Sequence, residues 1–149
     1  MSFLIDTNVL IRSLIPSHPQ FVDADAAIAK LRTRGEDLYL AAQNLYEYWV
    51  VATRPSAENG FGLSSVDASS ELKRLRNLYR VLADIPAILE EWETLVTCHA
   101  VMGKNGHDAR LVAAMKVHGI TSMLSFNKQD FLRYPEIQVK SPQDVLTNA

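Results

Sequence analysis

The amino-acid sequence predicts an α/β fold, in which a mainly parallel central sheet carries helices on both of its faces. Short apolar runs alternate along the chain with segments in which apolar residues recur at helical spacing, as strand–helix–strand units require. Several runs are apolar at consecutive positions, which is typical of strands buried on both faces. The chain has 149 residues, of which 48% are hydrophobic. We therefore expect residues 1–149 to form a single domain with one sizeable core.

The predicted elements begin and end at residues that commonly bound regular structure. Pro16 stops the first helix, and Gly35 and Gly119 follow two other helices. Ser65 is expected to cap one helix, and Pro86 suits the first turn of another. In chain order the predicted elements are strand 3–5, helix 9–15, helix 19–34, strand 38–41, helix 44–52, helix 65–78, strand 79–82, helix 86–99, helix 108–118, strand 120–126 and edge strand 137–139.

Residues 54–64 separate two of the predicted helices and read RPSAENGFGLS. Proline, asparagine and glycine at this density are typical of turns, so we expect a mobile connection without a domain boundary. The segment 127–131 is expected to be a loop after the fourth strand. Trp49, Trp92 and Phe126 each lie on an apolar stripe or strand, which favours a place in the core.

Composition excludes several classes of protein. Cys98 is the only cysteine, so no intramolecular disulfide can form, and the four histidines lack the spacing of a zinc site. Asp6 interrupts the first apolar run too early for a signal peptide. No apolar stretch approaches the roughly 20 residues of a membrane-spanning helix. We therefore expect a soluble, cytoplasmic protein that does not bind membranes.

The net charge of −2 argues against a protein that binds nucleic acid over its whole surface. This objection weakens if several acidic residues surround one divalent cation, because the remaining surface is then mildly basic.

Four acidic residues are expected to meet at one edge of the sheet. Asp6 ends the first strand, Asp108 begins a helix, and Asp130 lies in the loop after the fourth strand. Glu47 lies on the helix after the second strand and shares a helix face with Asn44. The carboxyl ends of parallel strands form the binding crevice of such sheets, so we expect these carboxylates to converge there.

Converging carboxylates repel one another unless a cation neutralises them or some of them bind protons. Oxygen ligands select Mg²⁺ or Mn²⁺, so a divalent cation of this kind is expected among these carboxylates. Such an ion can activate water and stabilise the charge on a phosphodiester during in-line displacement. The sequence therefore predicts hydrolysis of a nucleic acid.

Four segments together resemble the PIN-domain nucleases: LIDTNVL from Leu4, NLYEYW around Glu47, GHDARLVAAM around Asp108, and SFNKQDF from Ser125. The resemblance runs from about Phe3 to Phe131. It is closest to the VapC-type toxins of bacterial toxin–antitoxin pairs, which are single PIN domains of similar length.

The resemblance implies a PIN-like three-layer sandwich and an endoribonuclease that uses Mg²⁺ or Mn²⁺ and leaves a 5′-phosphate and a 3′-hydroxyl. It implies that Asp6, Glu47 and Asp108 are the first three acids of the site, with Asp6 and Asp108 as metal ligands. We expect Asp130 to be a further ligand, and Glu47 either to bind the metal or to position the attacking water. The fourth position is left open between Asp130 and Asn127, which would act through water. A cognate antitoxin protein and a homodimer are also implied.

Further residues are expected around the acids. The resemblance implies that Asn8 and Ser125 orient the site. Lys104 and Arg110 lie near the predicted crevice, where either could contact an RNA backbone.

Other interpretations remain open at this point. Taken singly, each acid is also typical of a helix cap, a solvated helix or a turn. The chain could be a non-catalytic RNA-binding or scaffolding module of the same fold. A protein that accepts phosphate on Asp6 is a third possibility, which the asparagine at position 8 disfavours.

Overall fold

The computed structural model describes residues 1–148, and its centre is a five-stranded sheet in which every neighbouring pair of strands is parallel. The strand order is β3-β2-β1-β4-β5, so β1 lies in the middle. Phe3 of β1 pairs with Leu38 of β2 on one side and with Ser122 of β4 on the other. The strands are β1 (Ser2–Ile5), β2 (Asp37–Leu40), β3 (Arg80–Val81), β4 (Ser122–Leu124) and β5 (Gln138–Lys140).

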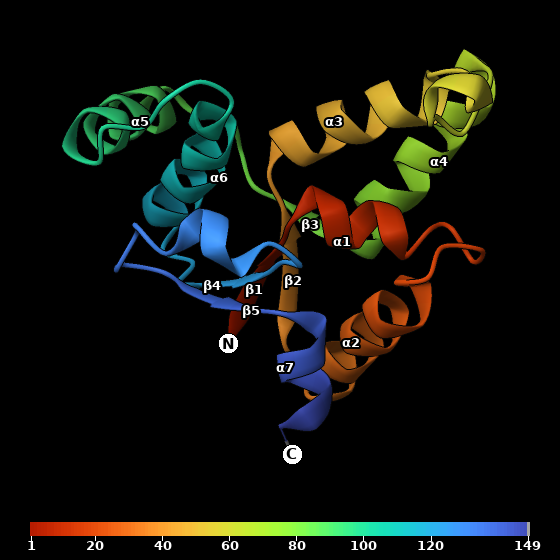
Figure 1. Ribbon diagram of the computed structural model, residues 1–149, viewed down its shortest axis with the longest axis horizontal. Coiled ribbons are helices and arrows are strands. Elements are labelled where there is room, and N and C mark those ends of the chain that lie inside the picture. The colour runs from red at the N-terminus through yellow and green to blue at the C-terminus, as the bar shows by residue number, and fades with distance from the viewer. Residues whose placement is uncertain (149) are drawn as a thin grey trace.

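Helices cover both faces of this sheet, which gives the predicted three-layer architecture (Figure 1). α5 and α6 pack together on one side, whereas α1, α2, α4 and α7 lie on the other. The helices are α1 (Thr7–Arg12), α2 (Phe21–Thr33), α3 (Ala42–Thr53), α4 (Ser65–Leu78), α5 (Pro86–Cys98), α6 (Asn105–His118) and α7 (Pro142–Thr147), with 3-10 helices η1 (Ser56–Glu58) and η2 (Lys128–Phe131). Within residues 1–148, none of these helices has the length and apolar character needed to cross a membrane.

The core consists of two apolar clusters, one on each face of the sheet. Alternate side chains of a strand point to opposite faces, and β1 supplies both clusters in this way. Phe3 and Ile5 pack with α1, α2, α3 and α7, while Leu4 packs with α5 and α6. All three residues are buried, which explains the uninterrupted apolar run that predicted this strand. Trp49 and Phe126 pack against the first cluster and Trp92 against the second, as expected.

Several predicted helix starts differ from the structure by one to three residues: α1 and α3 begin two residues earlier than predicted, and α2 begins two residues later. α4 is capped by Ser64, whose hydroxyl accepts a hydrogen bond from the backbone N–H of Asp67 at 3.1 Å, so the prediction of Ser65 as the cap was wrong by one residue. α6 begins at Asn105 rather than Asp108, because residues 105–107 already close the first turn through hydrogen bonds to residues 102–104. Asp108 therefore lies within the first turn instead of preceding it.

Two short elements were missed near the C-terminus. Residues 128–131, expected as a loop, form the 3-10 helix η2. α7 follows β5 and begins with a capping box, in which Ser141 and Asp144 each accept a hydrogen bond from the other's backbone N–H. α7 packs on α2 and closes the apolar cluster on that face with Val145.

The connection between α3 and α4, expected to be mobile, is tied back onto α3. Backbone N–H groups of Phe61 and Leu63 donate to the carbonyls of Val51 and Ala52, each at 2.9 Å. Gly60 makes this return possible, because a Cβ atom there would lie 1.9 Å from the carbonyl oxygen of Arg54. The turn residues of this segment therefore build a folded loop.

Candidate active site

The candidate site lies where the direction of strand addition reverses. From β1 the chain adds β2 and then β3 on one side of the sheet, and it later returns to add β4 and β5 on the other side. Such a switch point opens a crevice at the carboxyl ends of the central strands. Asp6 directly follows β1, and Ser125 directly follows β4, so their side chains meet at this point.

Asp6 is the most buried carboxylate of the site, with 7% of its surface exposed. It caps α1 by accepting a hydrogen bond from the backbone N–H of Thr7 at 2.8 Å. Its other oxygen, Oδ2, accepts from the Ser125 hydroxyl at 2.6 Å and from Nδ2 of Asn8 at 3.2 Å. These bonds fix the carboxylate at the end of the central strand.

Asn8 and Ser125 hold the loops after β1 and β4 together. Nδ2 of Asn8 also donates to the Ser125 hydroxyl at 3.3 Å, and its Oδ1 accepts from the backbone N–H of Phe126 at 3.2 Å. The Ser125 oxygen further accepts from the backbone N–H of Asn127 at 3.0 Å. Every polar atom of the Asn8 side chain thus serves to position Asp6 and the following loop.

Glu47 reaches the site through a threonine bridge that the sequence reasoning missed. The Thr7 hydroxyl donates to Oε1 of Glu47 at 2.6 Å and accepts from Nδ2 of Asn44 at 2.9 Å. Asn44 is completely buried, and its Oδ1 accepts from the backbone N–H of Ala41 at 2.7 Å. The start of α3 is thereby bound to the residue next to Asp6.

Asp108 is held from the opposite side, on the first turn of α6. The side chain of Gln43, buried on α3, donates to the backbone carbonyl of His107 at 2.9 Å. This bond fixes the turn that carries Asp108 relative to α3. Gln43 and Thr7 are therefore positioning residues. In the sequence, only their positions directly next to Asn44 and Asp6 could have indicated this role.

Asp130 and Asn127 both lie on the exposed loop after β4, where η2 begins. Asp130 is near enough to Asp6 and Asp108 to act on the pKa of each. Asn127 contributes its backbone N–H to Ser125, as described above. The choice between these two residues for the fourth position stays a prediction.

The carboxylates of the site influence one another's pKa values. The pKa of Asp6 is raised from 3.8 to about 6, mainly by burial; the Ser125 and Thr7 hydrogen bonds oppose this increase, and the charges of Glu47 and Asp130 contribute to it. The pKa of Asp108 is likewise raised to about 6, mainly by burial and in smaller part by the charges of Asp6, Asp130 and Glu47. Paired carboxylates with raised pKa values in a crevice are typical of functional sites.

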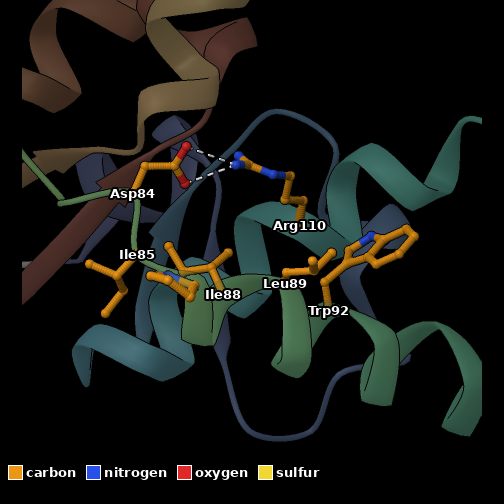
Figure 2. A pocket seen from close by; sticks show the side chains of 7 residues that line it. Asp84, Ile85, Ile88, Leu89, Trp92 and Arg110 are labelled. Carbon is orange, nitrogen blue, oxygen red and sulfur yellow. Dashed lines mark hydrogen bonds and ion pairs between the residues drawn. The ribbon is translucent and has the colours of Figure 1, made fainter.

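Lys104 and Arg110, the two basic residues predicted near the site, differ in their surroundings. Lys104 is exposed at the start of α6. Arg110 forms an ion pair with Asp84 at 2.8 Å and lines an apolar pocket of about 450 Å³ with Ile88 and Trp92 (Figure 2). Contact of Lys104 or Arg110 with RNA stays a prediction, and for Arg110 it competes with the Asp84 ion pair.

The donor chemistry of the crevice fits a hard divalent cation. Within residues 1–148, no three acidic, histidine or cysteine side chains are already gathered closely enough to enclose an ion. Mg²⁺, however, is commonly held by only one or two protein carboxylates and retains several waters. Burial is the main cause of the raised pKa values of Asp6 and Asp108, and repulsion between the carboxylates adds to it. A bound cation would favour the charged form of both groups.

Comparison with known families identifies the class of this protein. The model of the PIN domain matches residues 3–137, which is most of the chain. The chain therefore belongs to the PIN domain family, the family that its sequence motifs resemble. No curated protein sequence matches it significantly.

Solved structures share the fold over nearly the whole chain. The structure of VapBC-1 from nontypeable Haemophilus influenzae matches with a TM-score of 0.71 at 14% identity, covering 96% of this chain and 99% of that one. A toxin–antitoxin complex from Klebsiella pneumoniae matches with a TM-score of 0.65 at 18% identity, covering 94% and 97%. VapC20 from Mycobacterium tuberculosis, described as a sarcin–ricin loop cleaving toxin, matches with a TM-score of 0.57 at 17% identity, covering 81% and 86%.

Proposed function

We propose that this protein is a metal-dependent endoribonuclease that hydrolyses RNA phosphodiester bonds. The observation that carries the proposal is the position of Asp6 at the switch point of the sheet, hydrogen-bonded to Ser125 and followed by Thr7, which binds Glu47. The charge of Asp130 acts on the pKa of both Asp6 and Asp108, which adds to this support. Membership of the PIN domain family and the likeness to an RNA-cleaving toxin support it. The chemistry needs no nucleophilic side chain of the protein, because water is the attacking group.

In this proposal Asp6 and Asp108 hold Mg²⁺, or Mn²⁺ in its place, with Asp130 as a further ligand. The bound ion supplies charge to stabilise the phosphodiester and to ease deprotonation of water. Glu47, oriented by the Thr7 hydroxyl, positions the attacking water. Ser125 and Asn8 hold the Asp6 carboxylate and favour its charged form, so that it is available as a ligand at neutral pH.

RNA cleavage tests this mechanism directly. The wild-type protein should cut a single-stranded RNA with Mn²⁺ or Mg²⁺ and leave it intact with EDTA, and Asp6→Asn should be inactive with either metal. Asp25→Asn, which changes an exposed carboxylate of α2, is the matched control and should retain activity. Cleavage that persists with EDTA or in Asp6→Asn would contradict the mechanism. RNA that is bound without metal and never cut would favour the non-catalytic module instead.

We further propose that the protein is the toxin of a type II toxin–antitoxin pair, acts in the cytoplasm as a homodimer, and is blocked by a cognate antitoxin protein. The chain spans nearly the full length of the chains from complexes that it matches, which supports this assignment. Expression of the chain alone should arrest growth, and co-expression with the product of the neighbouring gene should restore it and yield a co-purifying complex. Normal growth together with the absence of any partner would contradict the assignment.

A further inference from the structure

A second pocket, lined by arginines, lies at the C-terminal ends of α1 and α3. Between α1, the C-terminal end of α3 and the loop 55–62 the structure contains a pocket of about 500 Å³. Arg12, Arg54 and His18 line it, together with the apolar side chains of Ile11, Val51 and Phe61.

Neither arginine of this pocket is neutralised. Within the described part of the chain, neither Arg12 nor Arg54 forms an ion pair with a carboxylate. Each donates only to a backbone carbonyl, Arg12 to Asn8 at 3.2 Å and Arg54 to Asn59 at 3.3 Å. The Nε atoms of both arginines are buried without a hydrogen-bond partner. Buried donors of a charged group are costly when unsatisfied, so this pocket is suited to an anionic ligand that satisfies them.

The pocket is joined to the carboxylates through α1. Arg12 lies six residues after Asp6, which corresponds to about 9 Å along a helix at ~1.5 Å per residue. The Arg12 guanidinium binds the backbone of Asn8, the residue that holds the Asp6 carboxylate, and stacks over the ring of Phe126 at 5.9 Å. Arg12 is therefore linked through Asn8 to the carboxylate of Asp6, and one extended strand could reach both.

Two further features suit a nucleotide. The imidazole Nδ1 of His18 accepts a hydrogen bond from the backbone N–H of Gln20 at 3.0 Å, which leaves Nε2 as a donor. The apolar side chains of Ile11, Val51 and Phe61 offer a surface on which a sugar or base can pack, while guanidinium groups bind phosphate through paired N–H donors. The cationic and apolar side chains of the lining thus suit the phosphate and the sugar or base of a nucleotide.

We propose that this arginine pocket binds a phosphate of the RNA strand beside the scissile bond, with Arg12 and Arg54 as its donors. The inference rests on the proposed ribonuclease function and names the residues that hold its substrate. The pocket also resolves an electrostatic difficulty, because four carboxylates repel a phosphodiester and the chain carries a net charge of −2. A local cationic pocket supplies the attraction that the overall charge lacks.

Binding measured without cleavage tests the proposal. A fluorescently labelled single-stranded RNA is titrated with protein in EDTA, so that the strand stays intact, and the Kd is measured by anisotropy over a series of salt concentrations. Arg12→Gln and Arg54→Gln keep much of the aliphatic stem but lose the charge. Each should weaken binding about tenfold, as expected for a lost hydrogen bond to a charged group. Each should also reduce the salt dependence of log K by about 0.7, the value for one phosphate contact on a single strand.

Arg34→Gln is the matched control, because Arg34 lies at the opposite end of the sheet, before β2. It removes the same charge and should leave both the Kd and the salt dependence at the wild-type values. Circular dichroism verifies that each variant is folded, and because Arg12 and Arg54 lie on different elements, one variant suffices if the other fails to fold.

Unchanged RNA binding in both pocket variants would overturn the proposal. The same holds if both bind RNA normally but lose binding to an acidic peptide, which would assign the pocket to a protein partner. The proposed function can fail separately. A wild-type protein that does not cut RNA with Mn²⁺, yet binds it through Arg12 and Arg54, would support the phosphate pocket and contradict the nuclease function.

Discussion

Replacing Asp108 by asparagine should make the metal-free protein more stable at alkaline pH. A pKa raised from 3.8 to about 6 means that ionised Asp108 is held less favourably in the folded state than in the unfolded state. Each pKa unit corresponds to ~1.4 kcal/mol, so the full cost is about 3 kcal/mol. Asp108 is partly exposed, and solvent screening reduces the expected gain to about 1–2 kcal/mol.

The sign of this effect depends on pH. Well below pH 3.8 the carboxyl group is protonated in both states, and even at pH 4 the stability of Asp108→Asn should lie close to that of the wild type. As the pH rises through the interval between 3.8 and about 6, the folded wild-type protein holds its proton longer than the unfolded chain, so its free energy of unfolding falls with increasing pH. The asparagine variant lacks this decrease and should therefore have a higher free energy of unfolding than the wild type at about pH 8.

Urea denaturation in EDTA at pH 4 and pH 8 measures the difference in the free energy of unfolding between the variant and the wild type. Asp25→Asn, which replaces an exposed carboxylate, is the control. Addition of Mn²⁺ should reverse the order at pH 8, because an ion present at about a hundred times its Kd stabilises the wild-type protein by ~2.7 kcal/mol and the variant less. An Asp108→Asn variant that is no more stable than the wild type at pH 8 would refute the electrostatic reasoning.

Three further changes probe the surroundings of the carboxylates. Thr7→Val should lower the cleavage rate by about tenfold or more, because Glu47 loses the hydroxyl that orients it. Thr7→Ser keeps a hydroxyl and should restore the rate. Equal kcat values in all three proteins would contradict the role of the Thr7–Glu47 hydrogen bond. Ser125→Ala should raise the pKa of Asp6 above about 6 and move the acidic limb of the pH–rate profile to higher pH, whereas Ser122→Ala, a change at a buried serine of β4, should leave the profile in place. Gly60→Ala should reduce the free energy of unfolding by about 1–3 kcal/mol, because its methyl group collides with the Arg54 carbonyl. Gly106→Ala, where the nearest atom lies at 3.9 Å, should cost far less in the same denaturation experiment.

The central sheet could be predicted from sequence because burial leaves a direct trace there. Phe3, Leu4 and Ile5 are apolar in succession since β1 is covered on both faces, and the same argument led to β2 and β4. α7 gave a weaker signal, since its first turn follows an edge strand with no intervening loop. Its capping residues Ser141 and Asp144 were nevertheless present and could have been recognised.

The carboxylates could be predicted as candidate site residues, because residues after parallel strands and at helix starts lie at the carboxyl edge of the sheet. Asn8 and Ser125, which hold Asp6, were expected to orient the site, but the contacts that orient Glu47 and Asp108 could not be predicted. Thr7 resembles an ordinary first-turn residue, and only the approach of α3 to α1 makes its hydroxyl a bridge to Glu47. Arg110 illustrates the reverse case, since its proximity to Asp108 in sequence said nothing of Asp84, which binds it from the loop after β3.

The two outer strands restrict how this molecule can associate with itself. β3 has two residues and β5 has three, and Arg80 and Lys140 place positive charge on them. Short, charged edge strands of this kind offer few free backbone groups to a strand of another molecule and disfavour growth into fibrils. A second copy that binds this chain would therefore meet its helical flanks, and continuous β-structure across such an assembly is not expected.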